Sequence, residues 1–168
     1  MNPGKITRRP VNHSDRPFLF ELYASTREAE LAQVQWTAEQ KLAFVAMQFD
    51  AQTVSYRESF PEGLYEIISA GEVPAGRIYW SRQPERIHIL DITVAPAYRN
   101  SGIGSYVLRE ILEEADRTGK SVTIYVEDFN PSSRLFERLG FRVAAHDGFQ
   151  LLLQRLPVPG GDGRQQDS

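Results

Sequence analysis

The stretch VAPAYRNSGIG, residues 94–104, decides the fold of this chain. It follows a segment rich in β-branched and large apolar residues, 86–94, and leads into the clearest helical pattern, 104–118. Its two glycines allow a tight turn with no Cβ to obstruct a ligand. The amides at a helix start and the helix dipole favour an anion, and Arg99 adds a positive charge suited to phosphate oxygens. The stretch therefore predicts a strand, a pyrophosphate-binding turn and a helix.

The helical pattern after the turn is amphipathic. Its apolar stripe consists of Val107, Leu108, Ile111, Leu112 and Ala115. Gly119 supplies a C-terminal stop. The turn differs from two familiar phosphate loops, because it lacks both the Gly-Lys-Ser/Thr ending and the glycine spacing of the dinucleotide fingerprint. Taken alone, it also fits a plain helix start with Arg99 in solvent.

A second segment, NPSSRLFERLGF at residues 130–141, follows a buried-looking strand predicted at 121–127. Asn130 is the predicted N-cap of a short helix, Pro131 its first residue and Gly140 its end. By itself this segment predicts only a capped helix with an apolar stripe.

Together the two segments resemble motifs A and B of the GNAT (Gcn5-related N-acetyltransferase) superfamily, the first being Gln/Arg-x-x-Gly-x-Gly/Ala. The resemblance extends in element order over about residues 5–156. It implies an α/β fold with an α+β mixed sheet, the acyl-CoA N-acyltransferase fold, in which helices flank a central twisted sheet. It also implies an enzyme that moves an acetyl group from acetyl-CoA to an amine.

The resemblance implies which residues bind the coenzyme. In the family, the amides of motif A hold the CoA pyrophosphate and the preceding strand pairs with the pantetheine arm. The positions that match here are Ile92, Val94, Arg99, Asn100, Ser101, Gly102, Ile103 and Gly104, with Asn130 and Phe136 from motif B. Acetyl-CoA is then the co-substrate, and no metal is expected.

Amine acetylation needs the acceptor in its neutral form. An alkylammonium has a pKa of about 10, so a base or a desolvating pocket must help to remove its proton. His88 is the first candidate for a catalytic base, because some relatives carry a catalytic glutamate on the same strand. Glu127 and Asp91 are the next candidates. A histidine with ordinary hydrogen bonds at a strand end fits His88 equally well.

Position 136 departs from the family pattern. Many relatives have a tyrosine there that protonates the CoA sulfur, whereas Phe136 has no proton to give. Water or another donor then takes this role, or the thiolate leaves with less help. Tyr125 and Tyr106 are near in sequence, and Phe136 also fits a core position.

The acceptor site is predicted at the first two helices and their loop, residues 24–37, with contributions from the final hairpin. Glu28 and Glu30 would attract a cationic amine, and Trp36 would line a pocket. A solvated helix end with one anchored aromatic side chain is the alternative. We expect a small-molecule or peptide amine as acceptor.

The remaining pattern predicts one domain, residues 1–157, and a disordered tail, 158–168, rich in Gly, Pro and Gln. The other predicted elements are a strand at 5–9, helices at 18–31 and from Thr37, a hairpin of 65–70 with 76–81, and final strands at 142–146 and 149–156. Thr37 and Gln40 fit a capping box, and Leu42, Val45 and Phe49 recur after it at helical spacing.

Composition excludes several classes. The chain has 168 residues, a formal net charge of −3 and no cysteine. The mild acidity argues against a general nucleic-acid binder, and the lack of cysteine excludes disulfides, thiolate metal sites and a cysteine nucleophile. Because no apolar run approaches the ~18 residues of a membrane span, we expect a cytoplasmic protein without a membrane partner.

Three interpretations stay open at this point. The leading one is an active N-acetyltransferase, and its main rival is a catalytically silent acyl-CoA-binding regulatory module, which Phe136 keeps in play. An acyltransferase that uses a longer acyl chain is the third. The resemblance also implies that a homodimer can form.

Overall fold

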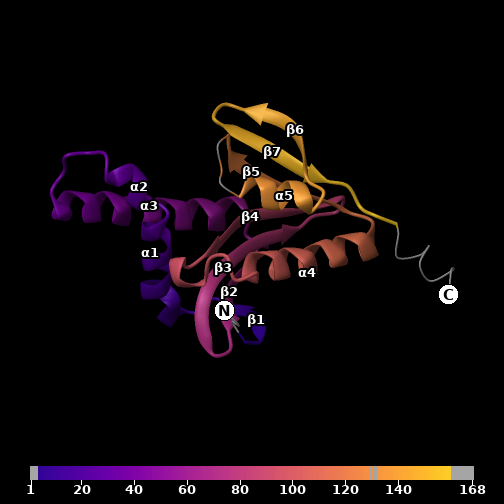
Figure 1. The fold of residues 1–168 in the computed structure, drawn as a ribbon, viewed down its shortest axis with the longest axis horizontal. Coiled ribbons are helices and arrows are strands. Elements are labelled where there is room, and N and C mark those ends of the chain that lie inside the picture. Colours follow the sequence, from indigo (N-terminus) through magenta and orange to yellow (C-terminus); the bar gives the residue numbers. More distant parts are fainter. Residues whose placement is uncertain (1–3, 129, 131, 160–168) are drawn as a thin grey trace. The chain divides into compact units, whose positions relative to one another are not determined.

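The computed structural model describes residues 4–128, 130 and 132–159. The strands are β1 (Ile6–Pro10), β2 (Leu64–Ala70), β3 (Val73–Arg82), β4 (Arg86–Val94), β5 (Ser121–Glu127), β6 (Arg142–Asp147) and β7 (Gln150–Arg155). The α-helices are α1 (Arg16–Ser25), α2 (Glu28–Leu31), α3 (Ala38–Ser59), α4 (Ile103–Thr118) and α5 (Ser133–Arg138), with 3-10 turns η1 (His13–Asp15) and η2 (Pro96–Tyr98). Figure 1 labels the helices and strands along the chain.

Within the described residues, the strands form one sheet in the order β1-β2-β3-β4-β5-β7-β6. β4 and β5 pair in parallel through the crossover helix α4, whereas the pairs β1–β2, β5–β7 and β6–β7 are antiparallel. The predicted mixed sheet with helices is confirmed. The chain divides into two compact units, Met1–Ile78 with Ile92–Ser101, and Tyr79–Asp91 with Gly102–Ser168.

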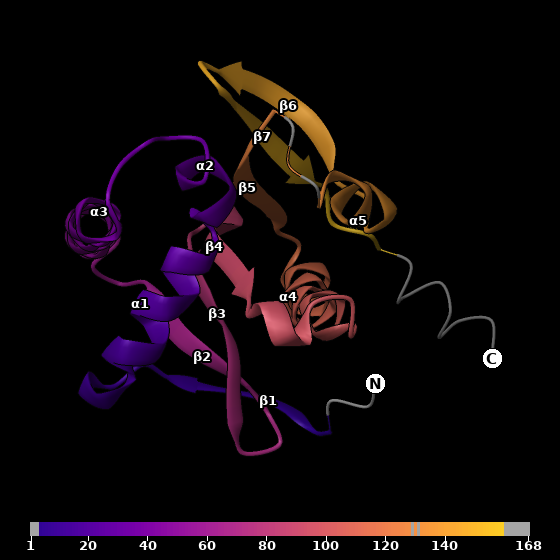
Figure 2. The same cartoon turned by 60° about the vertical axis from the view of Figure 1, so that its left-hand side comes forward.

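In the first unit, helices α1 and α3 pack on the sheet through a shared core. Figure 2 looks along α3 and shows α1 beside it. The core cluster consists of Leu19, Tyr23, Val45, Phe49 and Ile67. Leu42 was expected on the same stripe as Val45 and Phe49, but it is 59% exposed, because the cluster begins one turn later at Val45.

The helix predicted at residues 18–31 is wrong as a single element. It is split into α1 and α2, and where α1 ends the amides of Thr26 and Arg27 bond the carbonyl oxygens three residues back, while two hydroxyls also bond carbonyl oxygens of the last turn. The Ser25 hydroxyl donates to the Leu22 carbonyl at 2.7 Å, and the Thr26 hydroxyl to the Tyr23 carbonyl at 2.6 Å. Such side-chain bonds compete with the helical backbone.

The capping box predicted for the next helix is confirmed. The Gln40 amide donates to the Thr37 hydroxyl at 3.1 Å, and the Thr37 amide donates to the Gln40 side chain at 2.9 Å. Two amides that the helix cannot pair are thereby satisfied at the start of α3.

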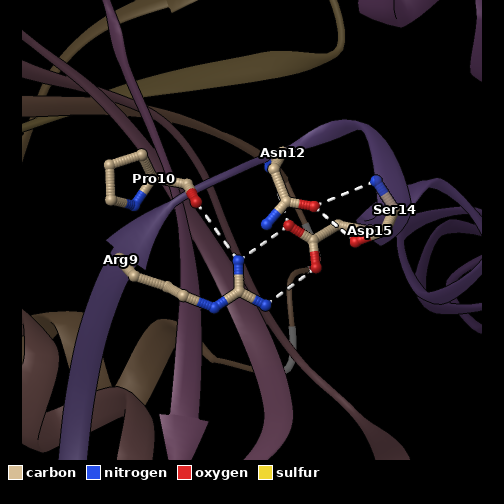
Figure 3. Close-up of polar contacts among 5 residues, drawn as sticks. All are labelled: Arg9, Pro10, Asn12, Ser14 and Asp15. Carbon is tan, nitrogen blue, oxygen red and sulfur yellow. Dashed lines mark hydrogen bonds and ion pairs between the residues drawn. The ribbon is translucent and has the colours of Figure 1, made fainter.

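An ion pair with a buried carboxylate fixes the connection from β1 to α1 (Figure 3). Both guanidinium nitrogens of Arg9 donate to the carboxylate of Asp15, each at 2.8 Å, and the Asn12 amide donates to the same carboxylate at 2.8 Å. Asp15 is only 5% exposed. The hydrogen bonds from Arg9 hold the pKa of Asp15 below its usual value and outweigh the opposing effect of burial.

In the second unit, the predicted apolar stripe of α4 is confirmed as core. The residues Val107, Leu108, Ile111, Leu112 and Ala115 are all buried, and α4 contacts β5. The helix ends at Gly119, whose φ of 68° is the left-handed conformation predicted for a C-terminal stop. The strands at 86–94 and 121–127 have the predicted bounds.

One prediction near the end of the second unit, the N-cap of α5, is wrong. Asn130 is not the N-cap of α5, which is Ser132. The Asn130 side chain instead accepts a hydrogen bond from the Ser132 amide at 2.6 Å, as in an Asx turn. Pro131 and residues 160–168 of the predicted tail lie outside the described residues. The Val158 amide donates to Asp116 of α4 at 2.8 Å.

The Arg9–Asp15 pair gives a prediction for stability. Asp15→Asn removes the charge from a buried carboxylate that accepts three hydrogen bonds, so unfolding free energy at pH 7 should fall by roughly 1.5–3 kcal/mol. Because the folded-state pKa of Asp15 is lowered, its contribution is complete above the unfolded-state pKa and is lost as pH falls through the folded-state pKa. Urea denaturation at several pH values should show the difference from wild type shrinking in acid.

Asp50→Asn is the matched control. Asp50 also pairs with an arginine, Arg16, but both side chains are more than half exposed. The control should cost less than about 1 kcal/mol at any pH. Equal losses in the two variants would contradict the role given to the buried pair.

Candidate functional site

The turn after β4 has an unusual backbone in the first unit. Asn100 has a φ of 62°, a left-handed conformation that side-chain-bearing residues seldom adopt. The Arg99 side chain donates to the Val94 carbonyl at 3.3 Å, and the Ser101 hydroxyl donates to the Tyr98 carbonyl. These bonds hold the turn, and the Arg99 residue as a whole is exposed.

Gly102 is the N-cap of α4 in the second unit. Its φ of 87° is left-handed, and a Cβ added there would meet no atom within 4 Å. As the N-cap it has no side chain to bond the first amides of the helix, so these amides have no side-chain cap. Ile103 is 1% exposed and can offer only its backbone to a ligand.

A second glycine, Gly76 of β3, lies directly against the end of β4. A Cβ on Gly76 of β3 would lie 2.4 Å from the Thr93 carbonyl, closer than any side chain permits. The Ala95 amide donates to the Ala75 carbonyl at 2.7 Å. Gly76 therefore lets β3 approach the strand that leads into the turn. Sequence reasoning missed this residue, although an isolated glycine inside a strand pattern is a signal of close backbone approach.

The pairing of β4 with β5 covers the first part of both strands. The register runs from Arg86 opposite Ser121 to Ile89 opposite Ile124. β5 then continues to Glu127 with β7 on its other side. The residues Tyr125 to Glu127 thus extend past the last position of β5 that pairs with β4.

His88 lies inside this paired region and is 5% exposed. Its Nδ1 lies 2.8 Å from the hydroxyl of Thr123, which also accepts a hydrogen bond from Arg86 at 3.1 Å. Burial, with a smaller effect of the Arg86 charge, lowers the pKa of His88 to about 4. The imidazole is therefore neutral near pH 7, and its burial favours a structural role over the predicted role of base.

Tyr125 lies next to His88 and is 41% exposed. The two rings meet edge to face, with centroids 5.8 Å apart and planes at 75°. Glu127, the other candidate base, is exposed at the end of β5. The structure thus brings His88 to Tyr125 and leaves Glu127 in reach of solvent.

Phe136 is buried, with 3% exposure, and packs edge to face on Phe141 at 5.5 Å. Its surroundings are those of a core residue, so the alternative that Phe136 is core is favoured over contact with a coenzyme sulfur. Asn130 keeps its side chain on the Ser132 amide.

Two of the predicted acceptor residues of the first unit, Glu30 and Trp36, contact protein neighbours, whereas Glu28 is exposed. Glu30 pairs with Arg27 at 3.0 Å, and Arg27 also donates to the Tyr23 hydroxyl at 3.0 and 3.1 Å. Trp36 is 41% exposed and meets Phe44 edge to face at 5.2 Å. The negative charge of Glu30 is therefore partly balanced by Arg27.

Sequence reasoning missed the polar group formed by Arg86, Thr123 and His88. The signal was the alternation of β5, which places Thr123 and Tyr125 on one face. Only the register with β4 shows that His88 stands opposite Thr123. Over the part of the chain that is described, no helix has both the length and the apolar character needed to cross a membrane.

Three solved structures illustrate the shared fold. A PaiA N-acetyltransferase from Thermoplasma acidophilum, solved in complex with coenzyme A, is 18% identical with a TM-score of 0.69, covering 90% of this chain and 99% of its own. An acetyltransferase from Thermus thermophilus is 19% identical with a TM-score of 0.63, covering 92% and 97%. The ribosomal-protein-S18-alanine N-acetyltransferase from Escherichia coli is 16% identical with a TM-score of 0.60, covering 93% and 97%.

These structures share the mixed sheet and helices of the acyl-CoA N-acyltransferase fold. Residues 19–141 match the model of the Acetyltransferase (GNAT) family, and the chain belongs to that family. A search of curated proteins finds no match.

The burial of Phe136 gives a prediction. Phe136→Tyr places a hydroxyl in a dry contact with Phe141, so unfolding free energy should fall by about 1–3 kcal/mol. Because a buried hydroxyl does not reach a bound thioester, no rate gain should appear at high pH. Thermal melting and a pH–rate profile measure the two effects. Wild-type stability together with a faster reaction at high pH would contradict the core assignment.

Proposed function

We propose that this protein transfers an acetyl group from acetyl-CoA to a primary amine by direct attack of that amine. The observation that carries the proposal is the start of α4, which follows a strand and a turn that bears Arg99. There Gly102 leaves the first amides without a side-chain cap, and a Cβ on Gly102 would meet no atom within 4 Å. Such a helix start suits a pyrophosphate. The family to which the chain belongs supports acetyl transfer.

The residues present fit the coenzyme in its chemistry. Backbone amides from Asn100 to Gly104 would hold the pyrophosphate, with the guanidinium of Arg99 beside it. The half-buried residues Ile92 and Val94 would offer the edge of β4 to the amide groups of the pantetheine arm. The Thermoplasma relative was solved with coenzyme A, which supports the same ligand here.

The bound thioester supplies an activated acetyl group, so the chain needs no nucleophile of its own, and it has no cysteine. Its residues have to orient the donor, admit a neutral amine and manage one proton. Glu127, exposed at the end of β5, is the carboxylate that we assign to take up the amine proton, directly or through water. His88 is too deeply buried for that role, and we assign it to positioning.

The acceptor is proposed to be a small-molecule or peptide amine. The Escherichia coli relative acts on an alanine of ribosomal protein S18, which makes peptide amino termini a class worth testing here. One observation favours a second function, a silent acyl-CoA-binding module: the position at which many relatives have a phenol holds the buried Phe136.

A pair of glycine variants tests the coenzyme site. Gly102→Val should place a side chain in the space meant for phosphate and weaken CoA binding on the order of 100-fold, about 2.7 kcal/mol. Gly119→Val is the matched control, since Gly119 is also left-handed, also faces open space and caps the other end of the same helix. Both variants carry similar backbone strain. Calorimetry with CoA should show the loss in the first variant only, and unchanged affinity in Gly102→Val would refute the site.

An amine panel tests the reaction. The protein is mixed with acetyl-CoA and separate small amines, polyamines or peptides with free amino termini, and free thiol is measured. We expect thiol release that depends on one amine class. CoA binding by calorimetry without thiol release from any amine would identify the silent module instead.

A further inference from the structure

Three strands of the second unit, β5, β7 and β6, lie next to one another in that order (Figure 1). Alternate residues of β5, namely Val122, Ile124 and Val126, are buried, and α4 contacts β5. Because side chains alternate along a strand, the residues between them face the other way. Two of those residues, Tyr125 and Glu127, are exposed. The face of the three strands that carries Tyr125 and Glu127 therefore has side chains in contact with solvent.

The middle of this face is an apolar row. Tyr125 of β5 lies opposite Leu152 of β7, and Leu152 lies opposite Ala145 of β6. Side chains at directly opposite positions of neighbouring strands share one face of the sheet. Tyr125 is 41% exposed, Ala145 is exposed and Leu152 is half-buried. These three side chains form a small apolar surface that crosses the strands and is open to solvent.

An acidic row lies beside the apolar row. Glu127 lies opposite Gln150, Gln150 lies opposite Asp147, and all three residues are exposed. Since two residues of a strand span roughly 7 Å, the two rows are separated by about that distance. Phe149, which precedes Gln150 in the sequence, is 89% exposed. Carboxylates and exposed aromatic rings both attract a cation, so this end of the face favours a positively charged group.

The other end of the face carries the opposite charge. Thr123 lies opposite Gln154, and Gln154 lies opposite Arg142, which is exposed. Arg86 also reaches this end, where it donates to the Thr123 hydroxyl at 3.1 Å. The two guanidinium groups repel a cation, whereas the acidic row attracts it. Charge therefore fixes the direction in which a ligand with one cationic end and one apolar part lies on this face.

The acceptor of the proposed reaction has these two parts if its nitrogen lies close to an apolar group. An alkylammonium, with a pKa of about 10, is cationic near pH 7 and suits the acidic row. An apolar group a few bonds away then reaches the apolar row and leaves water. Resting on the proposed function, we propose that this face binds the acceptor, and that the acceptor is an amine with an apolar group close to its nitrogen. Free arylalkylamines and peptides whose first residue is apolar share this chemistry.

The two carboxylates of the acidic row have different tasks in this proposal. The ammonium contacts Glu127, which takes up one proton, directly or through water, and leaves a neutral amine with its lone pair free. Asp147 lies two strands away, so it does not touch the nitrogen. It adds to the negative potential that draws the cation to this end of the face.

The first test measures binding without turnover, in the full chain and both with and without CoA. Calorimetry compares 2-phenylethylamine with ethanolamine, and a tripeptide amide that begins with phenylalanine with one that begins with glycine. Each pair differs in its apolar group and keeps the amine. At least one apolar compound should bind about tenfold more tightly than its partner, as burial of an apolar side chain predicts. The pair that shows the preference tells a free amine from a peptide amino terminus.

Variants of the apolar row test where the apolar group binds. Tyr125→Ser should remove the tenfold preference, whereas Tyr125→Phe should keep it, because the ring supplies the surface and the hydroxyl is not needed. Tyr106→Ser is the matched control, since Tyr106 is 45% exposed on α4, and it should also keep the preference. Melting temperatures of the three variants show whether each is folded.

Variants of charge test where the cation binds. Asp147→Asn should weaken the apolar amine by about two- to fivefold, the range of an exposed charge pair, and should make its affinity less sensitive to salt. Glu113→Gln removes an equally exposed carboxylate from α4 and should change neither quantity.

The outcomes separate this inference from the proposed function. If the protein neither binds CoA nor releases thiol with any amine, the proposed function fails and this inference fails with it. Suppose instead that thiol is released. Then equal affinity for apolar and polar amines, no binding of the apolar amines in either state, or a preference that survives Tyr125→Ser would overturn the acceptor surface while the proposed function stands.

Discussion

The left-handed backbone of Gly102 is the constraint on which the rest of the second unit depends. It stops the turn after β4 and sets the first residue of α4 at Ile103, whose side chain is buried at once. The start of the helix fixes which residues of α4 face inward, and the apolar face packs on β5, the strand to which this crossover helix leads. The same residue leaves the first amides without a side-chain cap, so the fold and the proposed anion site would share one cause.

Two of the buried polar side chains, His88 and Thr123, lie opposite each other in the pairing of β4 with β5. His88 and Thr123 occupy the paired part of β4 and β5, although apolar residues would fill these places at less cost in desolvation. The hydrogen bond between them offsets part of that cost, and burial lowers the pKa of His88, which keeps the imidazole neutral near pH 7. A polar group kept in a core at this expense is reasonable when it holds a neighbouring side chain, here Tyr125, at a fixed place.

Local patterns in the sequence predicted what local forces decide. The strands at 86–94 and 121–127 were bounded correctly, because apolar runs end where turn residues begin, and the capping box of Thr37 was visible as a spacing. The helix at 18–31 failed where amides at the end of α1 bond carbonyl oxygens three residues back and hydroxyls of two adjacent residues also bond that turn, an outcome that hydrophobic periodicity does not register. Burial of His88 and its register with Thr123 depend on strand pairing distant in sequence, so no local pattern contained them.

The two ends of α4 show why conformation alone does not make an anion site. Gly102 and Gly119 are both left-handed, and a Cβ on either would meet no atom within 4 Å. Their electrical surroundings are opposite, since the first end presents amides and the positive end of the helix dipole, and the second presents carbonyls. Arg117 in the last turn matches that second polarity. A phosphate is therefore stabilised only where the open backbone coincides with the positive end of the helix, and in α4 that place is Gly102.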